Sequence, residues 1–470
     1  MMNSARAIDI ELHLHAQTDP RLHENCGPLL ISKGSGARVF DDAGKEYIEG
    51  MSGLWCASLG FSNERLAGAA FDQMGKLAAY HTANHRSNEP ASALLDSIAS
   101  ISPIRPCKIF FTSSGSEAND SMVKFAWYYN TARGKPNKRK IISRNGAYHG
   151  STVMGAALSG LPTMHAAFNL PTHDVIFTER PHYFRDALPG ESIRGFGERL
   201  ARELEETILK EGADNIAAMI AEPVMGAGGV FIPPENYFPL VQEVLRRHDI
   251  LLLSDEIICG LGRTGNWFGS QTFNFQPDMM SIAKGLSAGH LPIAAVVLSD
   301  GIYQTIADQA AKIGLFGHGF TYAGHPVTSA VAVEAIRIYH EIDVIERARS
   351  MGQYLMNRLR SAFSDHELVG DIRGAGLMAG VELVAPGTHG RAFRTERRIG
   401  SIVEQNCRRH GAIIRNMGDT IAFCPPFVIS PAEIDLLVER VADAVNDTAD
   451  FVYQNNLSVE SACGPSAKDR

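Results

Sequence analysis

Residues 250–256 read ILLLSDE and residues 279–285 read MMSIAKG, so one apolar run ends on Asp255 and another on Lys284. Short, continuous apolar runs are typical of strands that are buried in a parallel sheet. A carboxylate at the end of such a strand is costly unless it meets a cation or several hydrogen-bond donors. A lysine held away from water has a lowered pKa and becomes a nucleophile toward carbonyl groups.

These two groups together match the needs of one cofactor, pyridoxal phosphate. That cofactor requires a lysine to form a Schiff base with its aldehyde and an acid to keep its pyridine nitrogen protonated. Each residue also has an ordinary explanation, because Lys284 can be a solvated lysine at a strand end and Asp255 can cap a helix or a turn. The hypothesis therefore depends on the residues around them.

The chain on either side alternates between helical and strand-like patterns from about residue 90 to 335. Helices are predicted over 117–133 and 198–211, and strand-like apolar runs lie at 140–143, 216–224, 250–255, 279–283 and 292–298. This alternation predicts an α/β domain with a mostly parallel sheet.

The flanking segments predict a second, smaller unit. Residues 37–49 have the pattern of a β-hairpin, a helix over 325–342 leads out of the α/β region, and beyond 343 helices alternate with short strands at 377–384 and 413–415. We expect an N-terminal segment (1–65) that contributes to the small domain, a large cofactor-binding domain (66–335), a C-terminal small α+β domain (336–455) and a disordered tail (456–470).

The composition excludes several classes of protein. The chain has 470 residues, 45% hydrophobic and 20% charged, and its net charge of −8 argues against nucleic acid as the main partner. Its seven cysteines are scattered with no zinc-type spacing, so we expect a reducing compartment and no metal. The first ten residues lack the apolar core of a secretory signal, and no apolar run reaches the roughly 18 residues that span a bilayer. We expect a cytoplasmic protein with no membrane partner.

A loop of small residues is a candidate phosphate site. Residues 112–117 read TSSGSE, follow an apolar run and open the predicted helix over 117–133, so the N–H groups near Gly115 and Ser116 point to where an anion would bind. The alternative is an ordinary helix start, because Ser114 and Glu117 have the spacing of a capping box. The two interpretations are compatible.

Three further residues are candidates for the walls of the pocket. Tyr148, in Tyr148-His149-Gly150, follows a strand and can lie flat on an aromatic ring, although aromatic residues at such positions are often packing residues. Trp55 is a candidate pocket wall or a core residue, and Thr321 offers a hydroxyl near glycines but can be part of a plain turn.

One motif is a false lead. Residues 260–265 read GLGRTG and match the dinucleotide-binding fingerprint after a strand. That fingerprint requires a helix next and an acid about 20 residues further on. Residues 266–269 read NWFG, which does not start a helix, so we interpret the match as chance.

Taken in order, the motifs resemble those of the class-III (ω-type) aminotransferases, pyridoxal phosphate enzymes of fold type I. The resemblance runs from about His13 to Phe451, and EPVMGAGG (222–229) and the segment 419–427, with Pro425-Pro426, make it closest to the amine:pyruvate and β-alanine:pyruvate branch. It rests on SGSEAND (114–120), YHG (148–150), EPV (222–224), SDEI (254–257), KG (284–285), GFT (319–321) and GHP (324–326).

The resemblance implies a fold and a cofactor. The fold would be a large domain with a mostly parallel, seven-stranded-type sheet plus a smaller α+β domain. Lys284 would hold pyridoxal 5'-phosphate and move the proton, and Asp255 would pair with the pyridine nitrogen. The ring would lie between Tyr148 and Ile257, with Glu222 near Asp255.

The resemblance also implies an assembly and a substrate contact. Gly115 and Ser116 would bind the phosphate together with Thr321 from a neighbouring subunit, which requires a homodimer or a dimer of dimers with sites at the interface. Arg415 matches the mobile arginine that holds a substrate carboxylate, and Trp55 and Tyr148 would also contact the substrate. The alternative for Arg415 is a surface arginine on a strand.

The implied activity is the transfer of an amino group from a primary amine or ω-amino acid to pyruvate or a similar keto acid, with ping-pong kinetics. Amine-accepting relatives often carry aromatic residues where this chain has Gln17 and near Ala83-Asn84, so we expect a wider or more polar pocket. The alternatives are another pyridoxal phosphate reaction, such as that of an aminomutase or a decarboxylating transaminase, or a dinucleotide-dependent dehydrogenase. The donor, the stereochemistry and the choice between dimer and tetramer stay open.

Overall fold

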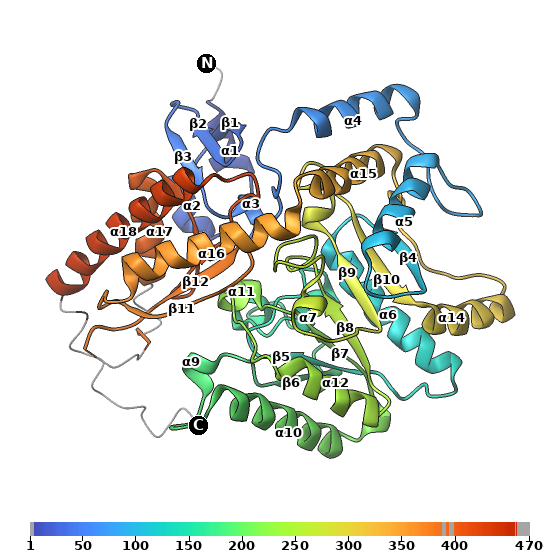
Figure 1. Cartoon of the computed structure of the whole chain (residues 1–470). Helices are drawn as coiled ribbons and strands as arrows, with labels where there is room; N and C mark the ends of the chain where they lie inside the picture. Colours follow the sequence, from blue (N-terminus) through green and yellow to red (C-terminus); the bar gives the residue numbers. More distant parts are fainter. Residues whose placement is uncertain (1–3, 388–391, 394–398, 456, 458–470) are drawn as a thin grey trace.

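The structure is a computed structural model that describes residues 4–387, 392–393, 399–455 and 457. At its centre is a seven-stranded sheet of order β4-β10-β9-β8-β7-β5-β6 (Figure 1). Strand β10 is antiparallel to both of its neighbours, and the other neighbouring pairs are parallel. The predicted α/β fold with a mostly parallel sheet is confirmed. The strands are β4 (Cys107–Thr112), β5 (Lys140–Arg144), β6 (Val175–Thr178), β7 (Ile216–Ala221), β8 (Leu251–Asp255), β9 (Met279–Ile282) and β10 (Ala294–Ser299).

Helices cover both faces of this sheet. Leu253 of β8 packs in one apolar cluster with Met122 of α6 (Gly115–Ala132) and Ile302 of α14 (Asp300–Ile313). Its neighbour Leu252 packs in another cluster with residues of α10 (Ile193–Glu211) and α12 (Tyr237–Arg247). Successive strand residues point to opposite faces. Both faces therefore need apolar side chains, which explains the continuous apolar runs in the sequence.

There are two smaller sheets among the described residues, and one of them combines strands from both ends of the chain. The predicted hairpin is confirmed as β2 (Arg38–Asp41) and β3 (Glu46–Glu49), which lie between β1 (Ile31–Ser35) and β13 (Ala412–Ile413). The other sheet has the order β11-β12-β15-β14. In Figure 1 the blue N-terminal strands accordingly lie beside the orange and red C-terminal elements. The four strands are β11 (Val369–Ala375), β12 (Met378–Leu383), β14 (Arg415–Met417) and β15 (Thr420–Phe423).

The prediction of a single strand over 413–415 was wrong. Residues 412–413 pair in parallel with β3, whereas Arg415 begins β14 and pairs with Ala422 of β15. The chain thus passes from one small sheet to the other at Ile414. A run of apolar residues does not reveal such a change, because it indicates burial and not the pairing partner.

The remaining helices range from single turns such as α3 to long helices such as α16 and α18. Residues 260–268 form turns and helix α13 begins only at Gly269, which agrees with the rejection of the dinucleotide fingerprint. The helices are α1 (Ala5–Leu12), α2 (Pro20–Cys26), α3 (Ser52–Trp55), α4 (Glu64–Lys76), α5 (Glu89–Ile101), α7 (Val153–Leu158), α8 (Pro162–His165), α9 (Tyr183–Asp186), α11 (Gly226–Gly229), α13 (Gly269–Thr272), α15 (Pro326–Glu341), α16 (Val344–Phe363), α17 (Ile399–His410) and α18 (Pro431–Gln454), with 3-10 turns η1 (Ala213–Asn215) and η2 (Lys284–Ser287).

Two expectations are left without a test. The domain boundaries stay a prediction, and the predicted disordered tail lies outside the described residues except for Leu457. Within the described ranges, no helix is both long enough and apolar enough to cross a bilayer.

Candidate active site

The predicted site residues gather at one edge of the large sheet. Asp255 ends β8, Lys284 follows β9, Glu222 follows β7, and Tyr148 follows β5 after a short loop. The carboxyl ends of parallel strands meet at one edge, which is where open α/β sheets bind ligands. A cavity of about 1120 Å³ lies there. Its lining includes Trp55, Gly115, Ser116, Tyr148, Glu222, Asp255, Ile257, Lys284 and Arg415.

Lys284 presents an amine that has no competing partner. Its backbone has φ 46°, a left-handed conformation that is strained for a residue with a side chain and is typical of functional sites. Within the described part of the chain, no hydrogen bond holds the Lys284 amine. Burial lowers the pKa of Lys284, and the negative charge of Asp255 opposes that shift. The amine is thus available for a carbonyl.

The turn that carries Lys284 is fixed by Tyr339 of α15. The Tyr339 hydroxyl donates to the carbonyl oxygen of Gly285 at 2.6 Å and lies 2.9 Å from the Ser58 hydroxyl. Tyr339 is fully buried, so this hydrogen bond anchors the strained turn to the core. Nothing in the sequence pointed to this role.

Asp255 is held by three donors. Its Oδ2 accepts a hydrogen bond from the Asn119 side chain at 2.7 Å and lies 2.8 Å from His149 Nδ1, while its Oδ1 accepts from the Ile257 N–H at 3.2 Å. A carboxylate only accepts, so His149 Nδ1 is the protonated nitrogen. Asp255, Asn119 and His149 are all buried. The sequence analysis quoted Asn119 and His149 within motifs but gave them no role.

Glu222 lies deep in the same cavity. Its Oε1 accepts from the Tyr148 N–H and its Oε2 from the Gly226 N–H, both at 3.1 Å. Burial raises the pKa of Glu222. The side chain therefore fixes the backbone of Tyr148 at the cavity wall.

The start of α6 is built both as a cap and as a cradle. Ser114 Oγ accepts from the Glu117 N–H at 3.2 Å, and the Glu117 carboxylate accepts from the Ser113 N–H at 2.7 Å. The first bond confirms the predicted cap at Ser114, whereas the second goes to Ser113 and so does not complete a capping box. The first-turn N–H groups of Gly115 and Ser116 have no carbonyl partner inside the helix. A Cβ atom on Gly115 would come within 2.7 Å of Ile257 Cδ1, so a larger residue there would push the Ile257 side chain aside. The cradle suits an anion.

Arg415 reaches the cavity from β14 and contacts a residue near the N-terminus. Its Nη2 donates to Gln17 Oε1 at 2.8 Å, and Gln17 Nε2 lies 3.5 Å from the Tyr148 hydroxyl. Arg415 is half-buried, and burial lowers its pKa. Gln17, predicted only as a departure that widens the pocket, is thus a direct partner of Arg415 and lines the cavity.

The other predicted pocket residues have mixed outcomes. Trp55 lines the cavity and is only 4% exposed, so it is both a pocket wall and a core residue. Thr321 is exposed and lies outside the cavity lining of this chain. Ala83 and Asn84 are exposed and do not line the cavity either.

Comparison with known proteins identifies the family. The family profile of "Aminotransferase class-III" matches residues 21–445, which is most of the chain. The chain belongs to the class-III aminotransferases. This protein is therefore a transaminase, and its substrates are a small-molecule amine and a keto acid.

Similar aminotransferases differ in their named substrates. Gamma aminobutyrate transaminase 3 (chloroplastic) of Solanum lycopersicum is 46% identical, over 91% of this chain and 82% of that protein. Vanillin aminotransferase of Capsicum frutescens is 46% identical, over 90% of this chain and 92% of that protein. The structure of the ω-transaminase of Pseudomonas jessenii in complex with PMP has a TM-score of 0.94 and 48% identity, over 96% of this chain and 99% of that one.

The cofactor of this aminotransferase is pyridoxal 5'-phosphate, as in its family. The residues at the cavity fit it: a buried amine at Lys284 that no described residue binds, a buried acid held in place at Asp255, and a helix start at Gly115 whose N–H groups have no carbonyl partner inside the helix. The chemistry of each group matches one part of the cofactor, namely its aldehyde, its ring nitrogen and its phosphate.

Proposed function

We propose that this aminotransferase moves an amino group from a primary amine or an ω-amino acid to pyruvate or a similar keto acid in a ping-pong reaction. The observation that carries the proposal is the Arg415–Gln17 contact in the lining of the cavity that Lys284 and Asp255 share. It places a guanidinium group with a replaceable neutral partner in the same cavity as the reacting groups.

The assigned roles follow from position and chemistry. Bound pyridoxal phosphate supplies an electron sink that acidifies the carbon next to the substrate nitrogen. Lys284 Nζ holds the cofactor and carries the proton away from that carbon, because burial favours its neutral form. Asp255 keeps the ring nitrogen protonated, and its three donors keep the carboxylate in place.

Other cavity residues orient the cofactor. Tyr148 and Ile257 would flank the ring and Gly115 and Ser116 would bind the phosphate, and these residues line the same cavity as Glu222 and Asp255. A Cβ atom on Gly115 would meet Ile257, so the small residue at the cradle and the apolar residue at the ring fit each other.

Arg415 distinguishes the two half-reactions. A guanidinium group binds a carboxylate through two parallel hydrogen bonds, which is stronger than its single bond to the neutral amide of Gln17. A keto acid or ω-amino acid therefore displaces Gln17, whereas an amine without a carboxylate leaves the contact intact. Two relatives support both substrate types, since one is named for gamma aminobutyrate and another for vanillin.

The assembly is part of the proposal. Thr321 is exposed and lies away from its own chain's cavity, which suits a contact to the phosphate of a partner subunit in a homodimer or a dimer of dimers. Sedimentation of the holoenzyme tests this: a monomer that retains full activity would contradict it.

A cytoplasmic location is the last part of the proposal. The unpaired cysteines among the described residues support a reducing compartment. Similar proteins are named chloroplastic and mitochondrial, so localisation of a tagged full-length chain by cell fractionation is the deciding test.

The activity is tested with a panel of amine donors and pyruvate, read as alanine formed. The proposal predicts alanine from aliphatic amines or ω-amino acids in wild type and none in Lys284→Ala. Carbon dioxide release, or a product isomeric with the donor, would instead indicate a decarboxylating transaminase or an aminomutase.

A further inference from the structure

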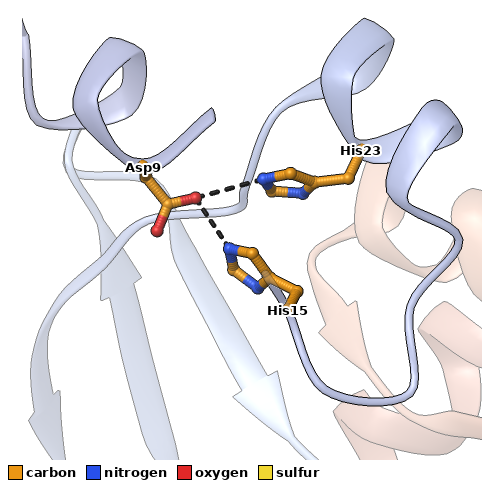
Figure 2. Close-up of side chains that lie close together, drawn as sticks. All are labelled: Asp9, His15 and His23. Carbon is orange, nitrogen blue, oxygen red and sulfur yellow. Dashed lines mark hydrogen bonds and ion pairs between the residues drawn. The ribbon is translucent and has the colours of Figure 1, made fainter. Parts of the chain in front are cut away.

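Three polar side chains near the N-terminus converge on one point. Asp9 lies on α1, His15 on the following loop and His23 on α2 (Figure 2). The Nε2 atom of His15 lies 2.7 Å from Asp9 Oδ1, and the Nε2 atom of His23 lies 3.2 Å from the same oxygen. All three donor atoms are within 4.8 Å of one another. The cluster is separate from the cofactor site described above.

Asp9 pairs with His15 and, through its other oxygen, with His13 at 3.3 Å, but these contacts leave His23 unsatisfied. Two imidazoles compete for one carboxylate oxygen, and among the described residues His23 Nε2 has no partner with hydrogen-bond geometry. The His23 side chain is only 8% exposed, so water does not readily replace that bond. A buried nitrogen without a partner costs free energy. An ion bound between the three side chains would satisfy all of them.

The donor types and spacings suit zinc. Zinc binds imidazole nitrogen and carboxylate oxygen at about 2.0–2.2 Å in a tetrahedron, which places neighbouring ligand atoms about 3.3 Å apart. The separations of 2.7 and 3.2 Å are close to that spacing. His15 and Asp9 are half-buried, so one side of the cluster is open for a water molecule as fourth ligand.

A second cluster of histidine and acidic residues is not a candidate metal site, because arginines already pair with its acids. His182, Asp371 and Glu382 also lie close together, but Arg373 forms ion pairs with both acids, at 2.7 and 2.6 Å. Arg185 pairs with Glu382 as well. The charge that a metal would neutralise is already neutralised there.

We propose that Asp9, His15 and His23 form a binding site for a divalent transition metal, best filled by zinc. The expectation of no metal rested on cysteine spacing and did not consider ligands that the fold brings together. Binding would replace the proton on the ligating nitrogen of His15, so one proton is released as the ion enters.

The site would fix one wall of the active-site cavity. Helix α1 has no buried residue and α2 buries only His23, so little apolar packing holds this segment. Residues 16–18 lie between the two histidine ligands and line the cavity, and Gln17 among them contacts Arg415. A bound ion would therefore stiffen the loop that presents Gln17.

The test is calorimetric titration of the EDTA-dialysed holoenzyme with ZnCl₂. One equivalent per chain is expected, and Asp9→Asn, His15→Asn and His23→Gln should each weaken binding by about tenfold or more, because each removes a ligand. Two controls should bind as wild type does: His173→Asn, an exposed histidine elsewhere, and Cys26→Ser, an exposed thiol near His23.

A structural readout accompanies the titration. Trypsin reaches the exposed Arg21 in this segment, and ZnCl₂ should slow cleavage there in wild type but not in His15→Asn. His15 is half-buried, so this variant is informative even if His23→Gln does not fold. No binding by wild type, equal binding by His15→Asn, or loss of binding in either control would overturn the proposal. None of these outcomes depends on transaminase activity.

Discussion

The contact between Gln17 and Arg415 leads to a prediction with two opposite arms. Gln17→Met keeps the length of the side chain but removes the oxygen that accepts from Arg415 at 2.8 Å. Gln17→Glu keeps the shape and replaces the neutral amide with a carboxylate. If a keto acid must displace residue 17 from Arg415, the first change should favour the keto acid and the second should oppose it.

The size of each effect follows from the surroundings. A hydrogen bond to a charged group contributes about 1.5–3 kcal/mol, and the low end applies because Gln17 is exposed. Its removal should raise kcat/KM for pyruvate by up to about tenfold, since about 1.4 kcal/mol is a factor of ten. Adding a negative charge at this exposed position strengthens the existing contact with Arg415 by up to about 1 kcal/mol. Gln17→Glu should therefore lower kcat/KM for pyruvate by about fivefold.

The assay is the second half-reaction, started from the aminated enzyme and followed with pyruvate or an aliphatic aldehyde as acceptor. The aldehyde is the control, because it has no carboxylate and both variants should leave its kcat/KM nearly unchanged. Equal shifts for both acceptors would show that Gln17 supports the fold of the loop. Pyruvate values that move in the same direction in both variants would refute the displacement argument.

Three further predictions concern buried polar side chains. Asn119→Ala removes one donor to Asp255 and should raise the dissociation constant of the cofactor by about tenfold, measured by titrating the apoenzyme; an unchanged constant would show that the bond is dispensable. Tyr339→Phe loses the bond to the Gly285 carbonyl and should lower the free energy of unfolding by about 1–2 kcal/mol in urea, with kcat reduced as the Lys284 turn loosens; unchanged values of both would contradict this. Burial raises the pKa of Glu49 from 4.5 to about 8. The folded state therefore holds this proton more tightly than the unfolded chain, so the stabilisation is full below pH 4.5 and is lost as the pH rises through about 8. The free energy of unfolding in urea should fall by a few kcal/mol between pH 5.5 and pH 9, at about 1.4 kcal/mol per pKa unit. The fall should be smaller in Glu49→Gln, and an equal fall in both proteins would contradict the assignment.

Much of the large sheet could be predicted from the sequence because its strands are buried on both faces. Continuous runs such as 250–255 and 279–283 indicate such strands, and the residues that end them fall at the ligand-binding edge. The edge strand β6 was missed, because its four residues are only half-buried and carry a weak signal.

The partners of the site residues could not be predicted in the same way. Gln17 and Arg415 are 398 positions apart, and Asn119 reaches Asp255 from a helix 136 positions earlier. Such contacts depend on how the elements pack and not on local periodicity. The same limit applies to Asp9 and His23, which lie on separate helices.

The central claim is that Lys284 is the residue that holds the cofactor. Reduction of the holoenzyme with borohydride, followed by digestion and mass spectrometry, locates the tethered pyridoxyl group directly. The account predicts one labelled lysine, Lys284, and no label in Lys284→Ala. A label on another lysine, or an unlabelled wild-type enzyme that is active, would contradict it.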